Sequence, residues 1–248
     1  MMPTMLRPRL GNALPIALAA LLVLQGTIAL RSAAAEPAAD RAAVAKGSGG
    51  SPAGADPSDA GEATRTDSPA NTIETFHAGL IDIMKHAKEL GIQGRIDKLT
   101  PLMKETFDLD FMASKAVGRH WRKLSDEDKK RWIEAFTRFT TANYAGRFTG
   151  YTGEKFVTKS IEEAPRNTRM VMTEILVPND KNVQLNYRLI DRDGKWKVID
   201  VFLDGTVSEL ALRRSEYSSA LKRDGFEHLL ASVETKIKDL KRKGEADG

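Results

Sequence analysis

The 248-residue chain contains no cysteine, and this absence excludes several kinds of chemistry at once. Disulfide bonds, thiolate nucleophiles, cysteine-ligated metal sites and a lipidated N-terminal cysteine are all impossible. The sequence also lacks the Gly-x-Ser-x-Gly motif of a hydrolase nucleophile. None of the four histidines, His77, His86, His120 and His228, has the His-Glu-x-x-His spacing of a metal site. No motif therefore predicts a metal or catalytic centre.

Aromatic residues are missing from the first 70 positions; the 9 Phe, 4 Tyr and 3 Trp all lie after them. Without aromatics, this segment cannot build a packed core. The folding unit is therefore predicted to lie within residues 71–248, the size of one ordinary domain. The net charge of +4 is spread over many charged residues, so it is weak evidence for nucleic-acid binding.

Residues 1–35 have the pattern of a secretory signal peptide. Arg7 and Arg9 precede an apolar stretch over 13–30, and Ala33-Ala34-Ala35 follows as a small-residue cleavage site. An uncleaved membrane anchor is the alternative, because the apolar stretch is just long enough to span a bilayer. Residues 36–70 are rich in Ala, Gly, Pro and Ser and are predicted to be a flexible linker. In either case the domain is expected outside the cytoplasm.

The domain reads as helices, then strands, then helices. Helical spacing predicts helices from about 71 to 90, 92–106, 107–117 and 125–148. Four β-like runs follow at about 154–162, 169–177, 183–189 and 195–203, joined by short turns as in an antiparallel meander. Two closing helices, about 208–221 and 226–240, are separated by Gly225. This order indicates an α+β domain.

The helix at 125–148 has an unusually broad apolar face. Trp132, Phe136 and Phe139 form one stripe, and Tyr144 and Phe148 lie on a second. A surface helix needs one stripe only, so this helix is expected to touch two partners. The second partner is either another helix or a cavity. The strand runs at 169–177 and 195–203 are also partly apolar on both faces, which indicates a covered or curled sheet.

Three stretches resemble one family of proteins. They are Phe107-Asp-Leu-Asp-Phe-Met-Ala113 with Gly118-Arg-His-Trp-Arg122; Trp132-Ile-Glu-Ala-Phe136 leading to Asn143–Tyr151; and Gly194–Gly205 continuing to Tyr217. Together they resemble the toluene-tolerance, or MlaC, family of periplasmic lipid-binding proteins over about 72–240. The segments 203–210 and 213–217 are most similar to the hopanoid-biosynthesis-associated HpnM branch.

The resemblance implies a fold and a function. The fold would be a four-stranded antiparallel sheet of NTF2-like character, packed with N- and C-terminal helices around an apolar lipid cavity. The function would be a non-enzymatic periplasmic carrier of a membrane lipid, hopanoid or glycerophospholipid, with no cofactor besides the bound lipid. Its partners would be an inner-membrane lipid transporter, of ABC/MCE or RND type, and an outer-membrane acceptor or donor complex.

Periodicity then selects candidate lipid-pocket residues on the broad helix and on the strands. Methionines are included because their flexible side chains form adaptable walls. The predicted set is Trp132, Phe136, Phe139, Tyr144, Phe148, Met170, Met172, Leu185, Tyr187, Leu189, Trp196 and Val198.

Two other functions remain open from the sequence. The first is an NTF2-like enzyme that uses Asp200, which lies among apolar residues, together with Tyr187 on a neighbouring strand. An ion pair between Asp200 and an arginine is the simpler interpretation of the same residue. The second alternative is a tethered adaptor without a ligand, which would have a packed interior.

Overall fold

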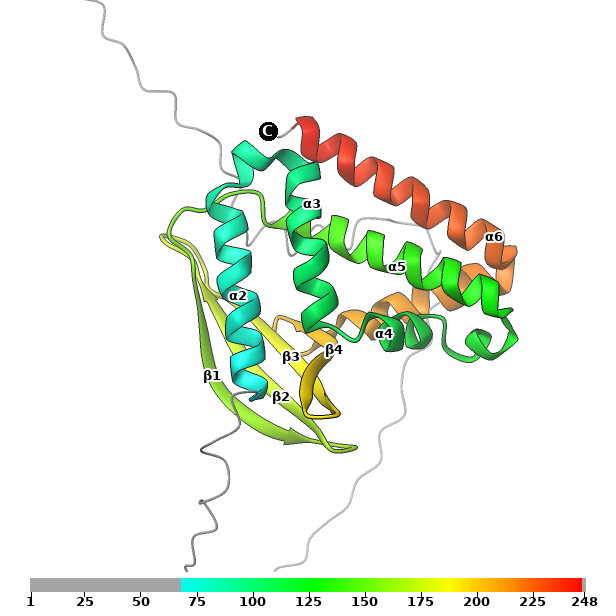
Figure 1. The fold of residues 1–248 in the computed structure, drawn as a ribbon, viewed down its shortest axis with the longest axis horizontal. Coiled ribbons are helices and arrows are strands. Elements are labelled where there is room, and N and C mark those ends of the chain that lie inside the picture. The colour runs from blue at the N-terminus through cyan, green and yellow to red at the C-terminus, as the bar shows by residue number, and fades with distance from the viewer. Residues whose placement is uncertain (1–67, 247–248) are drawn as a thin grey trace, which may run out of the picture.

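The computed structural model describes residues 68–246, so the predicted signal peptide and almost all of the predicted linker lie outside the described residues. Figure 1 shows long helices packed beside one curved sheet. The helices are α2 (Pro69–Lys85), α3 (Ala87–Thr106), α4 (Leu109–Ala116), the 3-10 helix η2 (Gly118–Lys123), α5 (Asp126–Arg147) and α6 (Glu209–Ala246). The strands are β1 (Lys155–Ala164), β2 (Thr168–Leu176), β3 (Val183–Arg192), β4 (Lys195–Leu203) and β5 (Val207–Ser208).

The first predicted helix is in fact two. The helix α2 begins earlier than expected, at Pro69, because the Ser68 hydroxyl accepts a hydrogen bond from the Asn71 amide at 3.1 Å. It ends at Lys85, and His86 separates it from α3. The predicted break at Gly91 is a kink within α3, where φ is 60° and ψ is −176°, a conformation that essentially only glycine adopts.

The sheet has five antiparallel strands in the order β1-β2-β3-β4-β5, where the sequence predicted four. The four predicted strands and their meander are present. The additional strand β5 has two residues and pairs with the end of β4 just before α6 begins. A strand of two residues leaves no period-2 pattern in the sequence, which is why it was missed.

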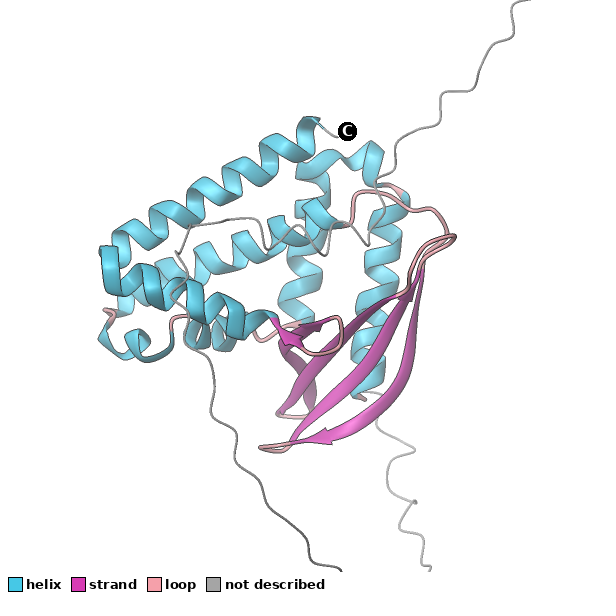
Figure 2. Ribbon diagram, turned by 180° about the vertical axis from the view of Figure 1, so that it is seen from behind, coloured by secondary structure: helices cyan, strands magenta, loops and turns pink. Residues whose placement is uncertain are grey.

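The two faces of the sheet have different neighbours. Val171, Tyr187 and Val201 are cross-strand partners, and all three are buried on the face that meets the helices. The adjacent row, Met170, Arg188 and Asp200, therefore points to the opposite face. The helix α6 begins at the end of the sheet, next to β4 (Figure 2). The outer face of the sheet is partly buried or exposed.

Aromatic rings fill the space between the inner face of the sheet, α2 and α5. The Phe76 ring on α2 lies 5.2 Å from Phe107, 6.0 Å from Tyr144 and 6.3 Å from Tyr187, measured between ring centroids. All four are at most 3 % exposed. Edge-to-face contacts of this kind add to the stabilisation from burial alone. The sheet, α2 and α5 are thus held together by one aromatic cluster.

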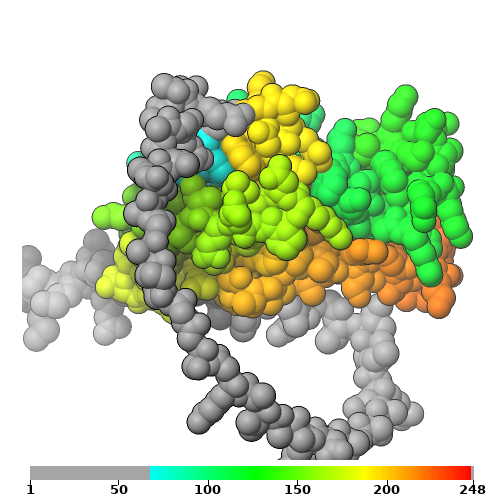
Figure 3. Space-filling view, turned by 90° about the horizontal axis from the view of Figure 1, so that it is seen from below, coloured from blue at the N-terminus to red at the C-terminus, as the bar shows by residue number. Residues whose placement is uncertain are grey.

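The helix α6 is kinked at Gly225, where φ is 81° and ψ is −178°. We call residues 209–224 its proximal half and residues 226–246 its distal half. The proximal half lies beside β4 and η2, on the face of the molecule seen in Figure 3. The distal half runs along α5 and ends against Ile92 of α3. Across residues 68–246, no helix combines the length and the apolar character needed to cross a bilayer.

Candidate functional site

A small apolar pocket lies between α5, the proximal half of α6 and the sheet. We call it the inner pocket. Its volume is about 20 Å³, and seven of its eleven lining residues are apolar. The apolar residues are Phe107, Met112, Phe136, Phe139, Tyr144, Val201 and Leu210; the polar ones are Thr140, Asn143, Glu209 and Arg213.

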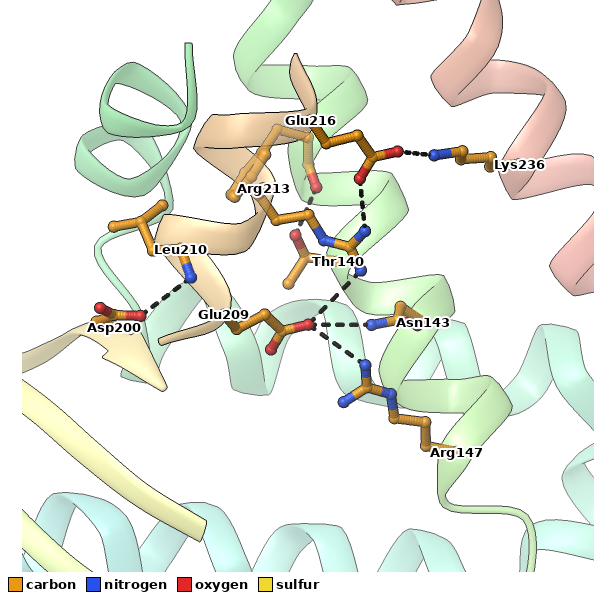
Figure 4. Close-up of polar contacts among 10 residues, drawn as sticks. Thr140, Asn143, Arg147, Asp200, Glu209, Leu210, Arg213, Glu216 and Lys236 are labelled. Atoms are coloured by element: carbon orange, nitrogen blue, oxygen red, sulfur yellow. Dashed lines mark hydrogen bonds and ion pairs between the residues drawn. The ribbon is translucent and has the colours of Figure 1, made fainter. Parts of the chain in front are cut away.

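The polar residues form one edge of this pocket, which we call the polar lip; it also includes Arg147 (Figure 4). The Glu209 carboxylate is its centre. One oxygen of Glu209 receives the Asn143 side-chain amide at 3.5 Å and the Arg147 guanidinium at 3.4 Å, and the Arg213 guanidinium lies 3.7 Å away. Asn143 and Arg147 belong to α5, whereas Glu209 and Arg213 belong to α6, so the lip joins two helices.

Arg213 has a second acidic partner. Its guanidinium lies 3.2 Å from Glu216, which in turn contacts Lys236 in the distal half of α6. Burial acts to lower the pKa of Arg213, but Tyr217 and two neighbouring carboxylates raise it by more. Burial acts to raise the pKa of Glu216, yet Lys236 and Arg213 lower it overall. Both groups therefore stay charged at neutral pH.

Arg147 is the least satisfied member of the lip. Its side chain is 14 % exposed, and its Nε atom is buried without a hydrogen-bond partner in the described part of the chain. A buried donor left in this state costs free energy unless something accepts from it. Its hydrogen bond to the Glu209 carboxylate uses a different nitrogen of Arg147, Nη2.

A second, larger hollow of about 1050 Å³ lies on the other side of α5; we call it the outer groove. Residues of α3, α4, α5 and the distal half of α6 line it, together with Arg192 and Lys197 of the sheet. Its lining is half charged: nine of the eighteen residues are acidic or basic, and five are apolar. Phe107 lines both hollows and thus stands between them.

The structure brings only three of the twelve predicted pocket residues to the inner pocket, namely Phe136, Phe139 and Tyr144. Others are buried in the surrounding core instead. Trp132, for example, is fully buried, donates its indole N–H to the Ala113 carbonyl at 2.9 Å and packs against Tyr217. The remaining core positions are Phe148, Leu185, Tyr187, Leu189 and Val198.

Met170, Met172 and Trp196 have different surroundings. Met170 and Met172 lie on the outer face of the sheet, because Val171 and Thr173 take the buried positions of β2. They therefore point away from the inner pocket. Trp196 is half-buried and packs against the edge of the core. Apolar residues on both faces of β2 made the orientation of this strand ambiguous in the sequence.

Asp200 neither joins Tyr187 nor forms an ion pair in the described part of the chain. Its carboxylate accepts hydrogen bonds from the Ser208 hydroxyl at 2.6 Å and the Leu210 amide at 3.1 Å, so it holds the first turn of α6. Burial raises its pKa, partly offset by these hydrogen bonds. Tyr187 faces the opposite side of the sheet. The two side chains cannot share an active site, which removes the pairing on which the enzyme alternative was based.

Tyr187 instead pairs with a histidine. Its hydroxyl and the His77 Nε2 atom are 2.9 Å apart in the core. Burial lowers the pKa of His77 to about 3, and burial raises the pKa of Tyr187 well above its ordinary value. Both groups are therefore neutral at pH 7, and neither faces one of the two hollows. The hydrogen bond satisfies one polar atom of each of these two buried side chains.

Sequence reasoning missed the polar lip. Glu209, Arg213 and Glu216 follow helical spacing, as do Asn143 and Arg147, so each group could have been placed on one face of its helix. Nothing in the spacing indicates that the two faces meet. Arg213 also stands beside Arg214 in a basic pair, yet Arg213 turns to the lip while Arg214 is exposed. Within residues 68–246, no group of three acidic or histidine side chains is arranged to hold a metal ion.

Comparison with solved structures finds the same fold elsewhere. A phospholipid-binding protein from Ralstonia solanacearum, solved in complex with a phospholipid, is similar over 71 % of this chain and 99 % of its own, with a TM-score of 0.60 and 20 % identity. The two proteins thus share a fold.

Comparison with curated proteins finds a similar sequence in Haemophilus influenzae. The intermembrane phospholipid transport system binding protein MlaC of that organism is 24 % identical over 131 residues. The match covers 51 % of this chain and 61 % of the relative. The family model for MlaC protein matches residues 74–235, well over half of the chain, and the chain therefore belongs to the MlaC family.

Proposed function

We propose that this protein binds a membrane lipid, without catalysing a reaction, and carries it across the periplasm between the inner and outer membranes. The ligand is a glycerophospholipid or a hopanoid. Its apolar part occupies the inner pocket, and its head group faces the polar lip. An inner-membrane lipid transporter, of ABC/MCE or RND type, and an outer-membrane complex are the proposed exchange partners, and the N-terminal segment either is removed on export or tethers the domain.

One observation carries the assignment of the site: the inner pocket is mainly apolar and has charged side chains along one edge only. That distribution matches an amphiphile, because the tail and the head group need opposite surroundings. Membership of the MlaC family and the lipid named for each of the two similar proteins support a lipid ligand. The outer groove is larger, but half of its lining residues are charged, which suits acyl chains less well.

The inner pocket has to widen to admit a lipid, because ligand pockets usually measure about 300–1,000 Å³. Leaving a bilayer costs an acyl chain nearly the burial that it regains in the pocket, so widening has to be cheap. The proximal half of α6 forms one wall and buries only Tyr217. Its contacts with α5 at the lip are polar, and water can replace them. We therefore propose that this wall moves.

Native mass spectrometry of the full chain tests the proposal. After incubation with vesicles of phosphatidylethanolamine, phosphatidylglycerol and a hopanoid, the purified protein is expected to carry bound lipid. Leu210→Trp places a large ring at the inner pocket and should reduce the lipid-bound fraction strongly. A wild-type protein that stays empty after this incubation would contradict the proposed function.

Two further variants separate the hollows. Leu212 is on the same helix but is 41 % exposed, so Leu212→Trp is the matched control and should bind lipid normally. Ile133→Trp fills the outer groove instead and should have little effect on a lipid seated in the inner pocket. If Ile133→Trp blocks binding while Leu210→Trp does not, the lipid occupies the outer groove and the site assignment is wrong.

A further inference from the structure

We infer that the polar lip is a binding site for the anionic head group of an amphiphile. Arg147 and Arg213 bind the anion. The Glu209 carboxylate occupies the same position in the absence of a ligand, and the anion displaces it. The ligand class is a phosphate or carboxylate attached to an apolar tail. This inference rests on the proposed function, because it concerns the head-group end of the same pocket.

The charges at the lip leave a cation in excess. Within the lip, Arg147 and Arg213 contribute two positive charges and Glu209 contributes one negative charge, while Glu216 and Lys236 beside the lip form an ion pair with each other. Glu216 is engaged by both Arg213 and Lys236. Glu209 is thus left to neutralise Arg147 and part of Arg213. An added anion would balance the cluster, whereas an added cation or a neutral group would not.

The contacts of Glu209 are long for a charged group. Its three donors lie 3.4, 3.5 and 3.7 Å away, all around one oxygen atom. Charge-assisted hydrogen bonds to a carboxylate are usually about 2.7–2.9 Å. The two guanidinium groups therefore converge on a position that Glu209 fills incompletely. A phosphate has more acceptor oxygens and can meet both groups at closer range.

One of these two guanidinium groups also has an unmet donor. The Nε atom of Arg147 is buried and lacks a hydrogen-bond partner among the described residues. A guanidinium binds an anion best through two parallel N–H groups, and Arg147 uses only Nη2 for Glu209. An anion that bridges Nε and Nη2 would remove the cost of this buried donor.

The surroundings strengthen the interaction and connect it to the tail. The side chain of Arg213 is 14 % exposed, and its guanidinium lies 4.9 Å above the ring of Phe139, a residue that lines the inner pocket. Charges attract one another more strongly where solvent is largely excluded. An anion at Arg213 would thus stand directly at the opening of the apolar pocket, which is the arrangement that an amphiphile requires.

Glu209 can leave without breaking the helix. It is the first residue of α6, and the first turn is held separately by Asp200 and Ser208, which accept hydrogen bonds from the amides of Leu210 and Ala211. Displacement of its side chain therefore costs the three long contacts but leaves the backbone hydrogen bonds intact. Glu209 keeps the two arginines together until an anion replaces it.

The test compares two lipids with the same acyl chains: dipalmitoyl phosphatidylglycerol, which is anionic, and dipalmitoylglycerol, which is neutral. Affinities are measured by competition for the full-length protein. Glu209→Gln removes the competing charge and should raise the affinity for phosphatidylglycerol about three- to tenfold, with no change for dipalmitoylglycerol. Arg147→Gln and Arg213→Gln should each lower the affinity for phosphatidylglycerol by about tenfold or more.

The direction of the Glu209→Gln effect is decisive, because a merely structural role would weaken the binding of both lipids. Unchanged or reduced binding of phosphatidylglycerol by this variant would overturn the inference. Arg214→Gln is the matched control, since Arg214 is the exposed neighbour of Arg213, and it should bind both lipids as the wild type does. Should Arg213→Gln fail to fold, the other two lip variants still decide the matter.

Two further outcomes separate the possible sources of failure. Inorganic phosphate alone should compete at least a hundredfold more weakly than phosphatidylglycerol. Equal competition would show that the lip binds a free anion and would overturn the inference that its ligand is an amphiphile. Equal binding of both lipids by every variant would overturn the head-group site while leaving the proposed function intact. Binding of neither lipid by the wild type would overturn both.

Discussion

The two halves of α6 are held in place by different forces. The distal half buries Leu229, Val233 and Ile237, and its Gly244 lies against Ile92 of α3 so closely that an added Cβ would come within 2.8 Å of that side chain. The proximal half has only Tyr217 buried, although it is nearly as long. Apolar packing therefore fixes one half of the helix.

The other half is held mainly by polar contacts, beside the single buried ring of Tyr217. Asp200 holds its first turn, Glu209 connects it to α5, and Glu216 connects it to the distal half through Lys236. Polar contacts contribute little net free energy because water replaces them when they break, whereas exposed apolar surface has no such substitute. The difference teaches that one helix can serve as both a fixed support and a movable wall, with the change of role at Gly225.

The comparison predicts its largest effect at Leu229, which is 2 % exposed. Leu229→Ala should lower the free energy of unfolding by about 2–5 kcal/mol, because it removes apolar contacts and leaves a cavity. Leu210→Ala, in the proximal half, should cost clearly less, since Leu210 is only half-buried. Urea unfolding followed by circular dichroism measures both. Equal losses would mean that the halves do not differ as described.

The kink gives the next largest effect. Gly225→Ala places a side chain in a backbone conformation that only glycine readily adopts and should cost about 1–3 kcal/mol. The cost would come from the backbone alone, because nothing lies within 4 Å of an added Cβ. Gly150→Ala has the same open space and is a control without this restriction. A tolerated Gly225→Ala, measured by thermal unfolding, would show that α6 can straighten.

Asp200 gives a smaller effect with a specific pH dependence. Asp200→Ala should lower the free energy of unfolding by about 1 kcal/mol, as for the loss of a helix cap. Because burial raises the pKa of Asp200 above its ordinary 3.8, its protonation favours the folded state. Its stabilising contribution is therefore complete below pH 3.8 and is lost as the pH rises through the higher folded-state pKa.

Asp200→Asn keeps an oxygen acceptor and should abolish this pH-dependent contribution. Unfolding curves at several pH values between 3 and 7 compare it with the wild type. An identical pH profile for the two proteins would contradict the predicted role of burial at this carboxyl group.

The smallest effect is expected at Tyr217. Its hydroxyl is buried and finds no hydrogen-bond partner within the described part of the chain. Tyr217→Phe should therefore leave the free energy of unfolding unchanged or raise it by up to about 1 kcal/mol, because it removes an unsatisfied polar atom. Differential scanning calorimetry measures the change. A clear loss of stability would show that the hydroxyl has a hydrogen-bond partner, which would be a further contact that holds the proximal half in place.

The elements of the fold were largely readable from the sequence. Helical spacing and the glycines at 91 and 225 located the helices and both kinks, and alternation located four strands. The resemblance to the MlaC family predicted the α+β architecture, and the structure and the fold shared with the Ralstonia solanacearum protein confirm it, with five strands in place of four. The break at His86 was missed because no glycine or proline marks it. The strand β5 was missed because two residues are too few to show an alternation of apolar and polar side chains.

The site was harder to predict, because periodicity assigns a residue to a face but not to a neighbour. Phe136, Phe139 and Tyr144 line the inner pocket, whereas Trp132 on the same helix packs into the core beside it. Which of these aromatics meets a hollow depends on how α6 crosses α5. That crossing also brings Arg147 to Glu209, over a separation of 62 residues that no local pattern encodes.

The hydrogen bonds of Asp200 make its surroundings a natural reporter of motion. One carboxylate oxygen accepts from the amides of both Val201 in β4 and Leu210 in α6. When the proximal half of α6 moves away, the Leu210 amide loses its protection and the carboxylate is free to turn from Val201. Hydrogen–deuterium exchange at these two amides should therefore accelerate together, at a rate independent of Leu229 and its neighbours. A bound lipid that holds the proximal half of α6 away from the sheet would therefore be detected as faster exchange of the Val201 amide in β4.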